Sequence, residues 1–124
     1  MILSTYIDHI VFRVKALDRT ERFYNALLGE PERAEHMLIY TVGDTRLFFT
    51  TAADQADLYD KENIGLNHVA FGIRTLAELQ AIETQLNSAG IAHSGIRIDR
   101  YGLKEYIWLD DPDGIRIEFY LRAE

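Results

Sequence analysis

The sequence predicts an α+β fold in which a strand, a helix and then two or three further strands occur twice. The first observation is a repeat: residues 7–14 resemble residues 66–73, each with a His followed by an apolar run that contains Phe. A helical pattern follows each of these segments, and strand-like alternation follows each helix. The length of 124 residues fits one domain, so we expect the two copies to be modules of a single domain spanning residues 1–124.

Both predicted helices carry start and stop signals. A capping box, in which an N-cap side chain and an acidic side chain three residues later satisfy backbone groups, is expected at each start. Gly29 and Gly90 follow the last periodic residues, where glycine readily takes the conformation that ends a helix. The predicted capping pairs are Asp18 with Glu21 and Thr75 with Glu78. The apolar faces comprise Thr20, Phe23, Tyr24, Leu27 and Leu28, and then Leu79, Ile82, Leu86 and Ala89.

Further strands are predicted after each helix. In the first module they lie at about residues 33–42 and 45–51, around a turn at Gly43-Asp44. In the second module they lie at about residues 91–98, 104–110 and 114–122, with the turn Asp111-Pro112-Asp113-Gly114 before the last. The modules are predicted at about residues 1–53 and 65–124, joined by an acidic linker. Neither half would bury enough apolar surface to be secure alone.

Alternation along the strands places polar side chains on the faces away from the helices. In the last strand Glu118 lies on the polar face, between Arg116 and Tyr120. His9 and His68 each lie opposite the apolar residues that are expected to pack on a helix. If the two sheets curl into one trough, the two imidazoles and the carboxylate converge within it.

The composition excludes several classes of partner and site. Acidic residues number 20 against 13 basic ones, and the net charge of −7 disfavours a nucleic acid or an anionic membrane surface as partner. The absence of cysteine excludes disulfides, thiolate metal sites and a Cys nucleophile. No segment has the apolar length of a membrane span, and the N-terminal residues lack a signal-peptide pattern. We therefore expect a soluble cytoplasmic protein.

Taken in order, the motifs resemble those of the vicinal oxygen chelate superfamily. Its members include glyoxalase I, extradiol dioxygenases, methylmalonyl-CoA epimerase, and the fosfomycin- and bleomycin-resistance proteins. The resemblance extends from about Tyr6 to Leu121 and rests on Asp8-His9-Ile10, Asn67-His68-Val69-Ala70-Phe71, and the segment from Trp108 to Glu118 with its Asp-Pro-Asp-Gly turn. It implies the glyoxalase/bleomycin resistance/dioxygenase fold, in which two βαβββ modules form a mixed-sheet trough, and it implies a homodimer.

The resemblance also implies a metal site. His9, His68 and Glu118 match the family's ligands for one divalent metal ion, and this donor set suits Fe(II), Mn(II), Zn(II) or Ni(II). Aligning the modules pairs Phe48 with Glu118, at a place where glyoxalase I and methylmalonyl-CoA epimerase keep a further ligand. A three-ligand site is therefore implied. Trp108 stands where the dioxygenases have a tyrosine.

We therefore predict a divalent-metal-dependent enzyme acting on a small substrate that chelates the metal through oxygens. Its chemistry would be dioxygenase-like, or lyase-, isomerase- or transferase-like. The alternative is a metal-free dimeric binding protein of the bleomycin-resistance type that sequesters a small molecule, and a structural or regulatory domain with relic ligands also stays open. Plain interpretations of the individual residues are an ion pair of Glu118 with Arg116 or Arg122, and hydrogen-bonded histidines.

Aromatic residues provide the remaining candidates. Tyr106 is the predicted catalytic residue, and His36 and His93 are the other candidates for a general base. The Tyr101-Gly102 loop could close over a substrate or be a plain turn. The residues predicted to line the substrate site are Phe48, Trp108 and Tyr120, although strand aromatics also pack against one another without a ligand.

Overall fold

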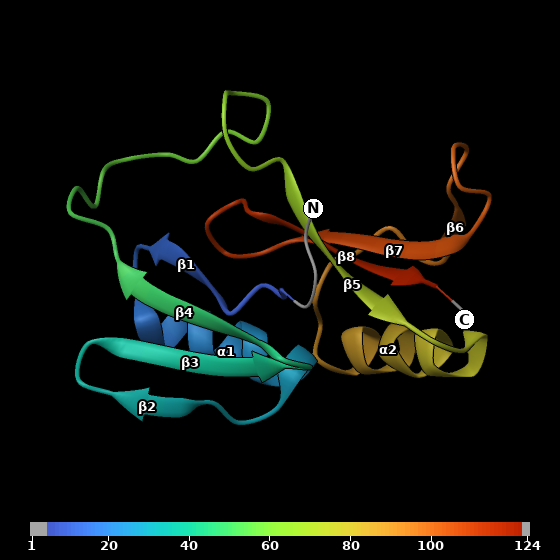
Figure 1. The fold of residues 1–124 in the computed structure, drawn as a ribbon, viewed down its shortest axis with the longest axis horizontal. Helices are drawn as coiled ribbons and strands as arrows, with labels where there is room; N and C mark the ends of the chain where they lie inside the picture. Colours follow the sequence, from blue (N-terminus) through green and yellow to red (C-terminus); the bar gives the residue numbers. More distant parts are fainter. Residues whose placement is uncertain (1–4, 123–124) are drawn as a thin grey trace. The chain divides into compact units, whose positions relative to one another are not determined.

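The computed structural model describes residues 5–122 and divides the chain into two compact units, Met1–Asp57 (unit 1) and Leu58–Glu124 (unit 2). Each unit contains one long helix and a four-stranded mixed sheet (Figure 1). The predicted α+β fold is therefore confirmed. None of the described helices is long and apolar enough to cross a membrane.

In unit 1 the strand order is β1-β4-β3-β2, with β1 parallel to β4 and the other neighbours antiparallel. The helix packs through Thr20 and Tyr24 against the face that carries Phe49. The elements are β1 (His9–Val14), α1 (Leu17–Leu28), β2 (Glu32–Ala34), β3 (Met37–Val42) and β4 (Thr45–Thr51).

Unit 2 repeats this arrangement with the order β5-β8-β7-β6, and β5 is parallel to β8. Leu79 and Leu86 are the buried residues of its helix. The tight turn before β8 is held by Asp111, whose Oδ1 accepts hydrogen bonds from the backbone N–H of Asp113 at 2.8 Å and of Ile115 at 2.9 Å. The elements are β5 (His68–Ile73), α2 (Leu76–Ser88), β6 (Arg97–Ile98), β7 (Glu105–Asp110) and β8 (Arg116–Leu121).

The central parallel pair has the same register in the two units. The alignment of Phe48 with Glu118 predicted from the sequence is therefore confirmed, because each lies opposite the residue two positions after the first histidine of its unit. The partners are His9 with Arg46 and Val11 with Phe48 in unit 1, and His68 with Arg116 and Ala70 with Glu118 in unit 2.

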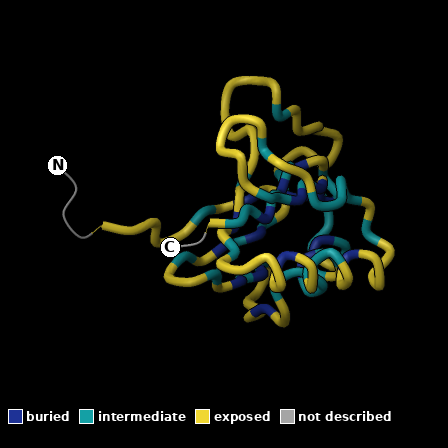
Figure 2. Tube along the Cα trace, turned by 90° about the vertical axis from the view of Figure 1, so that its right-hand side faces the viewer, coloured by how far each residue is buried: buried dark blue, intermediate teal, exposed yellow. Residues whose placement is uncertain are grey.

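Burial alternates along the strands as the period-two pattern predicts (Figure 2). In β1, Phe12 and Val14 are buried while His9, Val11 and Arg13 are exposed. The core of unit 1 is largely aromatic, and that of unit 2 is largely aliphatic. The buried apolar residues are Phe12, Val14, Tyr24, Leu38, Tyr40, Leu47 and Phe49 in unit 1, and Phe71, Leu79, Leu86, Ile107, Leu109, Ile115, Ile117 and Phe119 in unit 2.

The predicted capping box is confirmed in one helix and wrong in the other. Thr75 caps α2, where its Oγ1 accepts a hydrogen bond from the backbone N–H of Glu78 at 3.2 Å. The N-cap of α1 is Ala16, whose side chain can make no such bond. Asp18 lies inside the first turn, where its carboxylate accepts from the N–H of Arg19 and favours the positive end of the helix dipole.

Two strand predictions are also corrected. Residues 33–42 do not form one strand, because His36 takes a left-handed conformation (φ 59°) and reverses the chain between β2 and β3. In the segment 91–98 only Arg97 and Ile98 form a strand. The residues before them form local bonds instead, such as that from the N–H of Gly95 to Nδ1 of His93 at 2.9 Å.

Candidate metal and substrate site

The most distinctive pair of side chains in unit 2 is His68 on β5 and Glu118 on β8. Nε2 of His68 lies 3.6 Å from Oε1 of Glu118, and the side chains are 41% and 15% exposed. The two residues come from adjacent parallel strands and lie on the sheet face away from α2. Arg116 does not hold this carboxylate, because its Nε donates to Oδ1 of Asp110 at 2.7 Å. The plain interpretation of a Glu118–Arg116 pair is therefore wrong.

The residue before His68 sets the tautomer of its ring. The Asn67 amide donates through Nδ2 to the carbonyl of Lys61 at 3.0 Å, which turns its Oδ1 toward the histidine. That oxygen lies 2.8 Å from Nδ1 of His68, so the proton of a neutral ring is on Nδ1. The lone pair on Nε2 then faces a carboxylate oxygen. Two such electron-rich atoms are stable side by side only with a cation between them, either a proton or a metal ion.

Unit 1 carries the corresponding histidine without the carboxylate. Nδ1 of His9 lies 2.7 Å from Oδ2 of Asp8, which again leaves Nε2 free. The ring of Phe48 stacks on the imidazole with 4.9 Å between ring centroids, and the Arg46 guanidinium lies 5.4 Å from the Phe48 centroid. The predicted ligand His9 is thus oriented like His68 but has an aromatic neighbour.

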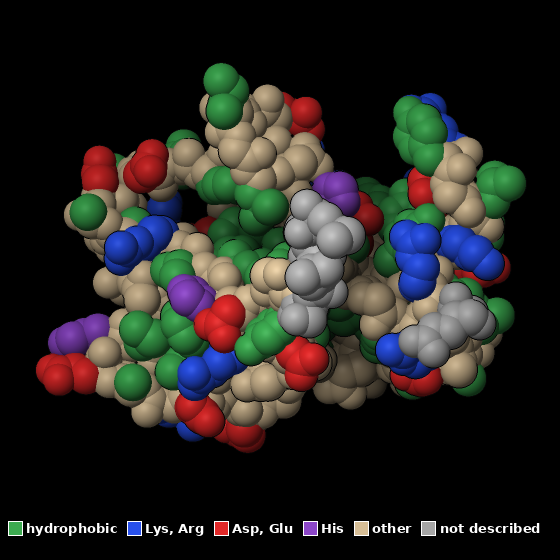
Figure 3. Space-filling view, in the orientation of Figure 1, with side chains coloured by type: hydrophobic (Ala, Val, Ile, Leu, Met, Phe, Trp, Pro, Cys, Tyr) green, Lys and Arg blue, Asp and Glu red, His purple; other side chains and the backbone are tan. Residues whose placement is uncertain are grey.

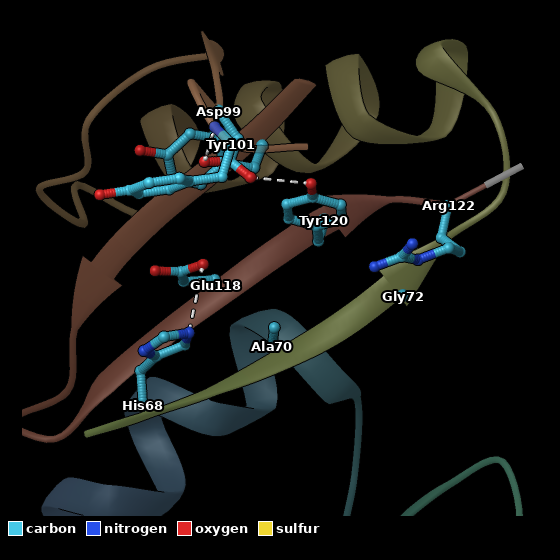
Figure 4. Close-up of a pocket in the computed structure, with 9 residues that line it drawn as sticks. His68, Ala70, Gly72, Asp99, Tyr101, Glu118, Tyr120 and Arg122 are labelled. Atoms are coloured by element: carbon cyan, nitrogen blue, oxygen red, sulfur yellow. Dashed lines mark hydrogen bonds and ion pairs between the residues drawn. The ribbon is translucent and has the colours of Figure 1, made fainter. Parts of the chain in front are cut away.

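A cavity of about 530 Å³ opens over the His68–Glu118 pair within unit 2 (Figure 4). Small residues of β5 and tyrosines of β7 and β8 form much of its surface. The volume is in the range of pockets that hold small organic ligands. The lining residues are His68, Ala70, Gly72, Asp99, Tyr101, Tyr106, Glu118, Tyr120 and Arg122.

The loop between β6 and β7 is fixed onto one of these tyrosines. Oη of Tyr120 donates to Oδ2 of Asp99 at 2.9 Å, and the backbone N–H groups of Tyr101 and Gly102 also donate to the Asp99 carboxylate. These bonds, led by the one from Gly102, lower the pKa of Asp99, and the Asp99 carboxylate raises the pKa of Tyr120. A Cβ on residue 102 would clash with Oη of Tyr120, so glycine permits this close approach.

Of the three candidates for a general acid or base, only Tyr106 lines the cavity of unit 2. Tyr106 lines the cavity, and among the described residues its hydroxyl makes no hydrogen bond. Nε2 of His93 lies 2.7 Å from Oδ1 of Asn87, outside the cavity lining. His36 is 85% exposed in the turn between β2 and β3 of the other unit. Neither histidine belongs to the cavity of unit 2.

The aromatic residues predicted to line the substrate site occupy different settings. Tyr120 lies in the cavity wall. Trp108 is the cross-strand neighbour of Glu118, and the Arg116 guanidinium covers its ring at 4.0 Å from the centroid. Phe48 stacks on His9 in unit 1. Tyr40, a further aromatic of unit 1, is buried and donates to Oδ1 of Asn25 at 2.6 Å, so it is a core residue.

Several cavity residues were not among the predicted site residues. Ala70 and Gly72 could be found only from the alternation that places them on the face of His68. Asp99 resembles any turn aspartate, because its partner Tyr120 is distant in the chain. Arg122 could be found by extending the polar face of the last strand beyond Glu118 and Tyr120.

The donor set fits a divalent ion at the His68–Glu118 pair. Two atoms that each bind one ion at about 2.1 Å lie roughly 3 to 3.5 Å apart, close to the separation of these two donors. Within residues 5–122 no group of three or more His, Asp or Glu side chains is placed together as a metal site. His68 and Glu118 would therefore hold the ion together with a donor from elsewhere.

Comparison with known proteins identifies the family. The model of the Glyoxalase/Bleomycin resistance protein/Dioxygenase superfamily matches residues 6–119. Escherichia coli (strain K12) YaeR, an uncharacterized protein, is 34% identical over 59 residues, which is 48% of this chain but only 43% of the length of YaeR.

Solved structures agree with this match. A glyoxalase family protein from Enterococcus faecalis has a TM-score of 0.76 at 27% identity, with 93% of this chain and 96% of the other covered. A glyoxylase/bleomycin resistance protein/dioxygenase domain from Frankia sp. EAN1pec has a TM-score of 0.75 at 20% identity, with 100% of this chain and 95% of the other covered. At this identity the similarity supports the fold alone. The chain belongs to the Glyoxalase/Bleomycin resistance protein/Dioxygenase superfamily.

Proposed function

We propose that this protein is a divalent-metal-dependent enzyme whose small substrate chelates the metal through adjacent oxygens. His68, Glu118 and His9 are the proposed ligands. The observation that carries the proposal is the approach of Nε2 of His68 to Oε1 of Glu118, at 3.6 Å, beside a cavity of small-molecule size. An uncharged imidazole with its proton on Nδ1 leaves a lone pair facing the carboxylate, and a cation resolves that conflict.

The third ligand is proposed from the repeat. His9 begins β1 as His68 begins β5, and the residue before each histidine orients Nδ1. Partners of this kind fix the ring of a metal-bound histidine and raise its basicity. Two imidazoles and one carboxylate leave coordination positions for a chelating substrate and suit Fe(II), with Mn(II), Zn(II) and Ni(II) as alternatives.

The roles of the tyrosines follow from their hydrogen bonds. A divalent ion would polarise a chelating substrate and stabilise charge on its oxygens. The Tyr120 hydroxyl already donates a hydrogen bond to Asp99, and that carboxylate raises the pKa of Tyr120, so Tyr120 stays neutral and forms part of the cavity wall. The Tyr106 hydroxyl is directed to no described partner. We therefore propose that Tyr106 exchanges a proton with the bound substrate.

The proposed reaction is cleavage of a catechol or enediol by oxygen, with lyase, isomerase or transferase chemistry as the alternatives. We also propose a homodimer, in which the ligands come either from one chain or from two. A symmetric pair would cover exposed strand edges, which otherwise invite aggregation.

The first experiment measures metal content after anaerobic purification without chelator. We expect about one divalent ion per chain in the native protein and its loss in His68→Ala, because a deleted ligand costs more affinity than the 10- to 100-fold effect of an outer-shell change. His93→Ala is the matched control, since Nε2 of His93 is bonded to Asn87. If neither native protein nor control takes up Fe(II), Mn(II), Zn(II) or Ni(II) added back, the metal-dependent function is wrong.

A second candidate function is metal-free sequestration of a small molecule. It is favoured by three tyrosines, Tyr101, Tyr106 and Tyr120, in one cavity wall, since aromatic rings bind flat and cationic ligands. This function requires no ion at Glu118. Binding of cationic aromatic compounds that is unchanged in Glu118→Ala would support it over the enzyme.

A further inference from the structure

We propose that the cavity of unit 2 binds an acid: a ligand whose chelating oxygens lie at His68 and Glu118 and whose carboxylate, at its far end, pairs with Arg122. This inference rests on the proposed metal-dependent function. It adds the charge of the substrate and its orientation in the cavity. It follows from the order of side chains along one face of β8 and of Arg122, the residue that follows this strand.

Three residues of that face form a charge sequence. Glu118, Tyr120 and Arg122 lie at alternate positions and all line the cavity. Their side chains are acidic, neutral and basic in that order. At about 3.3 Å per residue, the Cα atoms of Glu118 and Arg122 lie roughly 13 Å apart. A long arginine side chain shortens this gap to the size of one substituted ring, and Figure 4 shows the Arg122 guanidinium directed back over Gly72 toward the cavity.

Arg122 is held in place but its charge is not neutralised by a described neighbour. Its backbone N–H donates to the carbonyl of Ile73 at 2.8 Å, which extends the β5–β8 pairing. Its guanidinium carbon lies 5.2 Å from the Tyr120 ring centroid, a stacking contact that leaves the N–H donors at the edge free. Within residues 5–122 the arginine salt bridges involve other guanidinium groups.

The other acid of the cavity is not a competing partner for a cation or for Arg122. Both oxygens of Asp99 already accept hydrogen bonds, from Tyr120 and from the backbone of Tyr101 and Gly102. Three hydrogen-bond donors thus stabilise the negative charge of Asp99. On the face shown in Figure 3, basic side chains also gather over unit 2 near β6 and the end of β8, and they would attract an anion.

The floor between the two charged ends is open. Ala70 and Gly72 follow His68 on the same face of β5, and a Cβ built on Gly72 would meet nothing within 4 Å. The side chains therefore become smaller from the chelating end toward Arg122. This leaves room for a flat ligand body between Ala70 and the tyrosines.

The test uses aryl hydroxamates, which chelate metal through two adjacent oxygens and are not substrates for ring cleavage. The probes are benzohydroxamate and its para-carboxylate, para-carboxamide and para-trimethylammonium derivatives. Binding to the zinc-loaded protein is followed by fluorescence of Trp108, the one tryptophan, which neighbours Glu118 across the strands. We expect the carboxylate to bind about tenfold tighter than the isosteric carboxamide, the ratio that a 1.4 kcal/mol contact produces.

Variants assign the effect to one side chain. Arg122→Gln should equalise the carboxylate and carboxamide affinities without changing that of benzohydroxamate, and Arg122→Lys should keep part of the preference. Arg22→Gln, which removes the same charge from α1 of unit 1, should keep all of it. The preference should also weaken with added salt.

The outcomes distinguish the two proposals. If all four probes bind equally and lose binding in Glu118→Ala, the metal function stands and the acid pocket is wrong. Tighter binding of the trimethylammonium probe also overturns it. If no probe binds in a manner that depends on Glu118, the proposed function fails and the acid pocket fails with it. The carboxylate-to-carboxamide ratio in the native protein decides the question even if Arg122→Gln is unstable.

Discussion

The two units place different chemistry on one scaffold. They share strand order, the parallel central pair and its register, yet the equivalent position holds Phe48 in unit 1 and Glu118 in unit 2. The histidine beside it stacks on a ring in unit 1 and faces a carboxylate in unit 2. A single side chain at a fixed backbone position thus decides whether the histidine beside it contacts an aromatic ring or a carboxylate.

The second difference is the hairpin that joins an edge strand to its inner neighbour, β2 to β3 in unit 1 and β6 to β7 in unit 2. In unit 1 β2 and β3 are joined by a short turn at residues 35–36, whereas residues 99–104 join β6 and β7 in unit 2. Both connections contain a residue other than glycine with positive φ, His36 at 59° and Leu103 at 56°. The longer connection brings Asp99 and Tyr101 to the cavity of unit 2, so its extra length supplies part of the cavity wall.

The largest effect expected from this comparison is on metal binding. Glu118→Ala should reduce affinity for a divalent ion by more than about 100-fold, because it removes a proposed direct ligand rather than an outer-shell partner. Phe48→Ala, the equivalent change in unit 1, should leave the ion bound and remove the ring contacts with His9 and Arg46, each of about 0.5–1.5 kcal/mol. Calorimetric titration with Zn(II) and thermal unfolding measure the two quantities.

An equal loss of metal affinity in Glu118→Ala and Phe48→Ala would contradict this prediction, because it would mean that the two positions contribute equally to metal binding. A useful control is Glu118→Gln, which keeps the shape of the side chain and removes its charge. It should behave like Glu118→Ala in metal binding and like the native protein in unfolding.

A smaller effect is expected at the hairpin of unit 2. Gly102→Ala places a Cβ against Oη of Tyr120, so the loop or the Tyr120 side chain must move, and we expect a loss of about 1–3 kcal/mol in the free energy of unfolding. Gly43→Ala in the turn of unit 1 meets no atom within 4 Å and tests the cost of its positive φ alone. Chemical denaturation measures both.

The steric origin can be checked in a double-mutant cycle. Removing the hydroxyl in Tyr120→Phe should recover part of the loss in Gly102→Ala, because the nearest clashing atom is gone. Strictly additive losses in the double variant would place the cause in the backbone of the loop instead.

The repeat and the central register were predictable from the sequence because a strand has a period of two. Once the two histidines are aligned, alternation assigns every residue of β1, β4, β5 and β8 to a face, and Phe48 falls on Glu118. The Thr75 cap was predictable for a similar reason, since its partner Glu78 lies within one turn. Features that depend on spacing along the chain, such as strand alternation and helix caps, can therefore be predicted from the sequence.

Features that depend on backbone conformation or on distant partners were not predictable. Nothing near His36 marks a reversal, so the two short strands looked like one. Asp18 has the right type for a cap, but the helix begins one residue before it. The bond between Asp99 and Tyr120 joins a loop to a strand on the far side of a hairpin, and no spacing rule connects them.

The smallest expected effect is on the pKa of a tyrosine, and its cause differs between the two units. Burial is the main cause that raises the pKa of Tyr40 in unit 1, whereas a hydrogen bond to Asp99 is the main cause that raises the pKa of Tyr120 in unit 2. The Asp99–Tyr120 bond favours the protonated phenol of the folded state. Its stabilisation is therefore complete below the unfolded-state pKa, about 10, and is lost as the pH rises through the higher folded-state pKa.

Asp99→Asn should lower the pKa of Tyr120 toward its ordinary value of 10.0 and leave the pKa of Tyr40 high. The ultraviolet titration of tyrosinate, taken as the difference from a Tyr120→Phe background, isolates this one ring. An unchanged Tyr120 titration in Asp99→Asn would show that burial, as at Tyr40, and not the carboxylate controls the phenol.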